Sequence, residues 1–130
     1  MTLPDSLLDL LRKPSPCFLS TIMADGSPQV TETWVDTDGE NVIINTVEGF
    51  VKVRNVQRDP RVALAVQDPA DPFRYIQVRG EVISMTTEGG VESIEALSQK
   101  YTGQPYPWYG GRDQKRVILT ITANSVSGQG

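Results

Sequence analysis

The stretch Asn45–Leu64, NTVEGFVKVRNVQRDPRVAL, joins two predicted strands through a short cationic helix. The first strand ends at Thr46, and a turn containing Gly49 follows. The helix predicted over residues 50–57 makes about two turns, and Pro60 ends it because proline cannot continue the hydrogen-bond ladder. A helix that begins directly after a strand presents free backbone N–H groups and the positive end of its dipole. The stretch therefore predicts an anion site.

The two cations of this helix have a simpler interpretation as well. Lys52 lies in the first turn, and Arg54 points elsewhere on the helical wheel. Taken alone, these residues favour a solvated helix face whose apolar side chains pack inward. Arg58 and Arg61 are expected to pin the following turn by ion pairs with carboxylates such as Asp59.

Composition limits the possible functions. The 130 residues predict a single domain spanning 1–130, and the net charge of −4 argues against nucleic acid as a partner. The chain has no histidine, which excludes Ser-His and Cys-His nucleophiles, histidine metal sites and histidine-ligated haem. No metal site is predicted and no catalytic side chain is assigned, so that any catalysis would depend on other side chains or on a bound organic cofactor.

The cellular location follows from the cysteine content and the apolar runs. Cys17 is the one cysteine, which excludes an internal disulfide, and it lies in an apolar run typical of a buried thiol. No run is long enough to span a membrane, and the N-terminus does not resemble a signal peptide. These features predict a cytoplasmic protein with no membrane partner.

The pattern along the chain predicts a mainly β (α+β) domain. Short turns join most of the strands, and closure into an antiparallel barrel with a few flanking helices removes exposed edges. Gly80, inside the fifth strand, indicates a bulge. The tail, residues 123–130, is small and polar and is expected to be partly frayed. The six predicted strands cover 17–23, 28–36, 41–46, 61–67, 73–86 and 115–122, and the helices cover 3–12, 50–57 and 88–102.

Two further segments carry candidate site residues. The strand 28–36 places Gln29 and Thr31 on a polar face, although its neighbours are apolar. The loop 104–113, QPYPWYGGRD, is rich in aromatic residues and proline. Its aromatic side chains could line a substrate pocket or cap the end of the barrel.

Four segments in this order, SPQVTETWV, GFVKVRNVQRDPRVAL, PFRYIQVRGEV and QKYTGQPYPWYGG, resemble the split-barrel flavin and deazaflavin superfamily. That superfamily includes the pyridoxamine 5′-phosphate oxidases. Within it, the chain is most similar to small oxidoreductases that use the deazaflavin coenzyme F420. The resemblance extends over residues 4–125.

The resemblance implies a six-stranded split barrel that forms a homodimer, with cofactors in clefts at the subunit interface. It implies that Asn45 and Thr46 make polar contacts near the cofactor phosphate and that Lys52 pairs with it. Gln29 and Thr31 would lie near the cofactor ring.

The same resemblance adds the start of the helix to the cofactor site. Phe50, Val51 and Arg54 belong to this expected set, and Phe50 stands where many relatives carry a basic residue. Tyr106 and Trp108 are expected in the substrate pocket. The implied activity is hydride transfer between F420 and a small conjugated molecule. The alternatives are a flavin mononucleotide (FMN) enzyme, a non-catalytic cofactor carrier and a structural dimer with an empty cleft.

Overall fold

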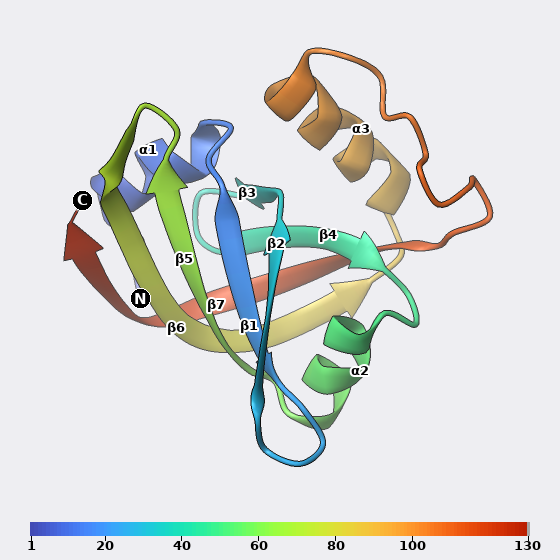
Figure 1. Cartoon of the computed structure of the whole chain (residues 1–130), viewed down its shortest axis with the longest axis horizontal. Helices are drawn as coiled ribbons and strands as arrows, with labels where there is room; N and C mark the ends of the chain where they lie inside the picture. The colour runs from blue at the N-terminus through green and yellow to red at the C-terminus, as the bar shows by residue number, and fades with distance from the viewer. Residues whose placement is uncertain (130) are drawn as a thin grey trace.

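The computed structural model describes residues 1–129, which form seven strands and three helices (Figure 1). The helices are α1 Asp5–Arg12, α2 Val51–Arg58 and α3 Gly90–Thr102. The strands are β1 Cys17–Ile22, β2 Pro28–Thr33, β3 Val35–Thr37, β4 Val42–Val47, β5 Arg61–Asp68, β6 Asp71–Thr86 and β7 Arg116–Gln129. The helices predicted from sequence are all present.

The seven strands form one antiparallel sheet in the order β2-β1-β5-β6-β7-β4-β3. Its two edge strands, β2 and β3, are consecutive in the chain and are separated only by Trp34. The sheet must therefore curl until its edges meet, which gives the predicted antiparallel split barrel. The number of strands differs from the prediction because the expected strand 28–36 is divided at Trp34. At this point the N–H of Val35 bonds to the hydroxyl of Tyr101.

The tail was predicted wrongly. Residues 123–129 continue β7 and pair along β6 between Tyr75 and Gly80. The small polar side chains suggested fraying, but the backbone of a strand is held by its neighbour whatever side chains it carries. Gly130 lies outside the described residues.

Glycine and turn chemistry shape the long strand β6. The sheet register shifts between Arg79 and Gly80, as the predicted bulge requires. A Cβ atom at Gly80 would meet the backbone carbonyl of Thr122, so only glycine fits there. The predicted loop 68–72 is reduced to a two-residue turn between β5 and β6.

The core lies inside the curled sheet. Leu7, Leu10 and Leu11 of α1 are fully buried in one hydrophobic cluster with residues of the sheet, and α1 lies against β3 and β5. Cys17 is buried in the same cluster, as predicted.

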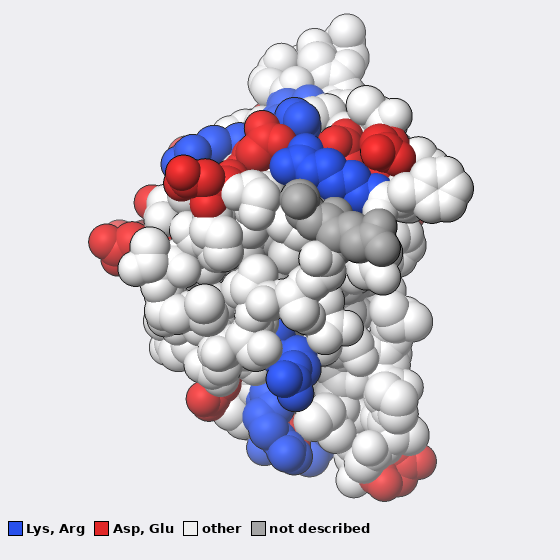
Figure 2. All heavy atoms as spheres, turned by 90° about the vertical axis from the view of Figure 1, so that its left-hand side faces the viewer, with Lys and Arg blue, Asp and Glu red and all other residues white. Residues whose placement is uncertain are grey.

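On the surface beside α1, Arg74 pairs with Asp9 and Asp68. Figure 2 shows positive and negative side chains side by side over this end of the molecule. Within residues 1–129, no helix is long and apolar enough to cross a membrane.

Candidate functional site

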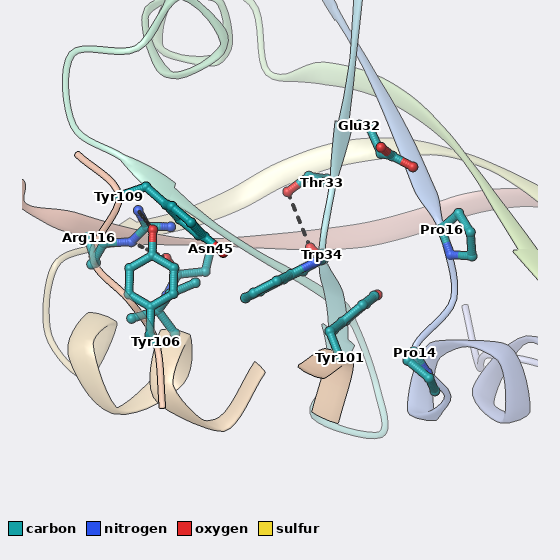
Figure 3. Close-up of a pocket in the computed structure, with 11 residues that line it drawn as sticks. Pro14, Pro16, Glu32, Thr33, Trp34, Asn45, Tyr101, Tyr106, Tyr109 and Arg116 are labelled. Atoms are coloured by element: carbon teal, nitrogen blue, oxygen red, sulfur yellow. Dashed lines mark hydrogen bonds between the residues drawn. The ribbon is translucent and has the colours of Figure 1, made fainter. Parts of the chain in front are cut away.

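A pocket of about 390 Å³ opens where the two edges of the sheet meet, between the β2–β3 junction, the start of β1, β4, β7 and α3 (Figure 3). Its wall is polar at two opposite ends and aromatic between them. The lining residues are Pro14, Pro16, Glu32, Thr33, Trp34, Asn45, Ile94, Tyr101, Tyr106, Tyr109 and Arg116.

A stack of two rings fixes the middle of this wall. The rings of Trp34 and Tyr101 are 5.1 Å apart and nearly parallel. The Tyr101 hydroxyl accepts the N–H of Val35 at 3.0 Å and donates to the carbonyl of Ser15 at 2.7 Å. Burial of this hydroxyl raises the pKa of Tyr101. One side chain of α3 thereby holds the β2–β3 junction and the segment before β1 together.

The aromatic loop is tied to α3 by Glu95. One oxygen of this carboxylate accepts the backbone N–H of Tyr106 at 3.1 Å, and the other accepts the indole N–H of Trp108 at 3.2 Å. Tyr106 meets Trp34, Trp108 and Tyr109 edge to face. Of the two predicted substrate-pocket residues, Tyr106 therefore lines the pocket, whereas Trp108 does not line it and supports Tyr106.

The cation at one end of the pocket is Arg116, the first residue of β7. Its side chain is buried, and its Nε donates to Oδ1 of Asn45 at 2.8 Å. Its Nη1 lies 3.4 Å from the hydroxyl of Tyr106, and the guanidinium lies over the Tyr106 ring at 5.4 Å. It forms no ion pair with any carboxylate of residues 1–129. Burial lowers the pKa of Arg116.

Sequence reasoning missed Arg116, because it opens an apolar strand and looks like an ordinary strand-end charge. Its burial comes from Tyr106 and Asn45, which are 10 and 71 residues away. Asn45 was predicted to contact a phosphate. In the structure its oxygen is engaged by Arg116, and its amide donates to the carbonyl of Gly90 at 2.9 Å. Thr46 is also buried, but it follows Asn45 in β4 and does not line the pocket.

The second group of predicted residues lies at the start of α2. Lys52 is half-buried, whereas Phe50, Val51 and Arg54 are exposed. Burial lowers the pKa of Lys52, and the nearby positive charge of Arg116 lowers it further. Within residues 1–129, Lys52 forms no ion pair. The first backbone N–H groups of α2 have no partner within the helix, and a second hollow of about 550 Å³ lies beside this end.

The third group lies on β2, under α2. Gln29 and Thr31 lie on one face of the strand, as the alternation predicted, and in the structure this face is half-buried. The side-chain oxygen of Gln29 accepts from Thr21 at 3.3 Å and from the amide of Asn55, a buried residue of α2, at 3.5 Å. The hydroxyl of Thr31 is buried and has no hydrogen-bond partner among residues 1–129. These residues do not line the aromatic pocket.

Arg58 is the last residue of α2, and Arg61 is the first residue of β5. Arg61 pairs with Asp59 at 2.7 Å, as predicted, and hydrogen bonding to Arg61 lowers the pKa of Asp59 to about 2. Arg58 instead donates to the carbonyl of Ile22 at 3.2 Å. Both arginines hold the end of the helix and lie outside the pocket.

The split barrel with a cationic and aromatic site at its closure is the architecture of cofactor-binding oxidoreductases. The family model described as pyridoxamine 5′-phosphate oxidase matches residues 3–130. The chain belongs to this family of flavin-binding oxidoreductases.

Solved structures agree with this assignment. An F420 reductase is 30% identical, with a TM-score of 0.84 over 96% of this chain and 98% of that chain. A conserved hypothetical protein of Mycobacterium tuberculosis, Rv2991, is 24% identical, with a TM-score of 0.75 over 95% of this chain and 82% of its own. HupZ of Group A Streptococcus is 18% identical, with a TM-score of 0.67 over 95% and 91% of the two chains. The last two likenesses concern the fold alone.

Proposed function

We propose that the protein is an F420-dependent oxidoreductase that transfers a hydride between the deazaflavin cofactor and a small conjugated organic substrate. The observation that carries this proposal is the 30% identity to an F420 reductase over nearly the whole of both chains. The other solved structures described above are less similar and do not indicate a cofactor.

The residues at the start of α2 fit a phosphate group. Lys52 is a half-buried cation that forms no ion pair with a carboxylate of residues 1–129. The free N–H groups at the beginning of the helix add partial positive charge beside it. Holding a lysine charge away from water is unfavourable unless an anion pairs with it. A bound phosphate would supply that pairing.

The aromatic pocket supplies the second half of the site. When bound, a reduced deazaflavin supplies two electrons as a hydride, so this chain's residues have only to position the reacting molecules. Trp34, Tyr101 and Tyr106 form a wall that excludes water from a flat substrate. The Tyr106 hydroxyl faces the pocket beside Arg116 and is placed to donate a proton to the reduced product.

The family match favours FMN as the alternative cofactor, because the family binds flavins. Both F420 and FMN carry a phosphate, so the start of α2 suits either ligand. The test is a parallel titration of the purified protein with F420 and with FMN, followed by absorbance and fluorescence. We expect F420 to bind more tightly. Tight FMN binding without F420 binding would refute the proposal. Oxidation of reduced F420 by a panel of enones and nitroaromatics would then separate an enzyme from a carrier.

The proposal includes a homodimer with the cofactors at its interface. The exposed side of β1 and β2 carries Phe18 and Val30, which are 39% and 65% exposed. Ala65 lies beside Phe18, and Ala63 lies two residues along the same strand. These side chains form a small apolar surface, with Glu32 opposite Phe18 at its margin, and exposed apolar surfaces of this kind mediate association.

A further inference from the structure

Arg116 is a buried cation with unused hydrogen-bonding capacity. A guanidinium carries five N–H donors, and among residues 1–129 only its Nε and Nη1 have partners, Asn45 and Tyr106. The side chain is only 9% exposed and has no carboxylate partner within residues 1–129. A buried charge without a counter-charge is unfavourable. A ligand anion would relieve that cost.

The surroundings hold Arg116 in one orientation. Asn45 donates to the Gly90 carbonyl, which turns its oxygen towards Nε of Arg116. The Tyr106 ring supports the guanidinium from one side at 5.4 Å. Glu95, the carboxylate that anchors the aromatic loop, is engaged by Tyr106 and Trp108. The remaining donors of Arg116 are thus kept available at the pocket wall.

The pocket is polarised from end to end. Figure 3 shows Arg116 and Asn45 on one side of Trp34 and Glu32 on the other side, with the Glu32 carboxylate pointing away from Arg116. A molecule with an anionic group and a flat body would place the anion at Arg116, away from Glu32. A carboxylate matches the planar fork of arginine, because its two oxygens can accept two parallel N–H bonds. The volume of about 390 Å³ is at the small end of ligand pockets, which suits one or two rings.

We propose that this pocket binds the hydride acceptor and that the acceptor is a planar conjugated carboxylate whose carboxyl group pairs with Arg116. This inference rests on the proposed function in one respect: it takes the molecule bound in the pocket to be the hydride acceptor. It adds a negative charge to the small conjugated substrate of the proposed function.

The test compares trans-cinnamate, a flat conjugated acid, with its uncharged analogue cinnamamide. Both are titrated into the protein without cofactor and followed by two-dimensional NMR, in which the indole signal of Trp34 reports the pocket. We expect cinnamate to bind at least about tenfold more tightly, the effect of one charge-assisted contact. Equal affinity of the acid and the amide in the wild-type protein would overturn the inference.

Variants locate the effect. Arg116→Met is expected to abolish the preference for the acid over the amide, and Arg116→Lys to restore part of that preference. Arg79→Met is the matched control, because Arg79 is exposed and its nearest polar partner is Ser125. An unchanged preference for the acid in Arg116→Met would refute the pairing.

Adding F420 separates this inference from the proposed function. Simultaneous binding of cinnamate and F420 supports a substrate pocket. Mutually exclusive binding, with F420 weakened by Arg116→Met, would assign the pocket to the cofactor and overturn the inference. If F420 fails to bind but cinnamate discrimination persists, the proposed function fails, whereas the carboxylate site at Arg116 stands.

Discussion

Lys52 and Arg54 are two residues apart in α2 but have different surroundings. Lys52 is half-buried near Arg116, whereas Arg54 is exposed. Lys52→Ala should therefore weaken binding of a phosphate-bearing cofactor about tenfold to a hundredfold, the range for a hydrogen bond to a charged group. The measurement is a fluorescence titration with F420, or with FMN if that ligand is the tighter one.

Arg54→Ala is the matched control and should leave the affinity almost unchanged. Because burial lowers the pKa of Lys52, folding disfavours its charged form. The cofactor-free Lys52→Ala protein should then be at least as stable as the wild type. Full cofactor affinity in Lys52→Ala would contradict its assigned role.

Cys17 provides a test of the core. Burial raises the pKa of its thiol from about 9.0 to about 12. At pH 8 the thiol should resist Ellman's reagent in the native protein and react when denaturant is added. Because the folded pKa lies above the unfolded one, stability should be constant below pH 9 and fall as the pH rises towards 12. Rapid labelling of the native protein would contradict the burial.

At the residue scale, the sequence predicted what local spacing determines. The helical wheel separated Lys52 from Arg54, and the strand alternation placed Gln29 and Thr31 on the same face of β2. Arg116 was not predictable in this way. Its burial arises only when Asn45 and the aromatic loop meet at the start of β7, which no local pattern reports.

At the element scale, α3 is attached to the barrel through Tyr101. Its hydroxyl joins Val35 of β3 to Ser15 before β1. Tyr101→Phe leaves both backbone groups without this partner and should lower the free energy of unfolding by about 1–3 kcal/mol. Denaturant unfolding at neutral pH measures the change.

The control for that experiment is Tyr109→Phe, because Tyr109 is 80% exposed. This variant should change the stability by less than about 0.5 kcal/mol. If Tyr101→Phe is equally harmless, then the hydroxyl does not join the three elements and the pocket wall has another support.

The elements themselves were mostly predictable, and the two exceptions have the same cause. The division of strand 28–36 at Trp34 depends on a hydrogen bond from Val35 to a residue 66 positions away. The extension of β7 through residues 123–129 depends on pairing with β6. Side-chain patterns indicate which face of a strand is buried, but long-range pairing decides where the strand ends.

At the scale of the whole molecule, closure of the barrel creates the pocket. The edge strands β2 and β3 meet at Trp34, and the pocket opens at this junction. The short turns and strand patterns predicted an antiparallel barrel, and the family resemblance implied that it is a split barrel; both are confirmed. The association of two such barrels was implied by the family resemblance and remains to be tested.

The apolar surface on β1 and β2 makes that association testable. The chain has a mass of 14.3 kDa, so the proposed dimer should elute with twice that mass in size-exclusion chromatography with light scattering. Val30→Glu places a charge on a side chain that is 65% exposed in the single chain and would be desolvated in the dimer. It should shift the protein to monomer without lowering its stability as a monomer.

Phe73→Ser is the control for that substitution, because Phe73 is 80% exposed at the start of β6, outside the β1–β2 surface. It should leave the mass unchanged. If Val30→Glu remains dimeric, the subunits associate through another face, and the cofactor cleft must be sought there. If the wild-type protein is monomeric at micromolar concentration, Lys52 and the pocket must bind cofactor without a partner, and a shared site is refuted.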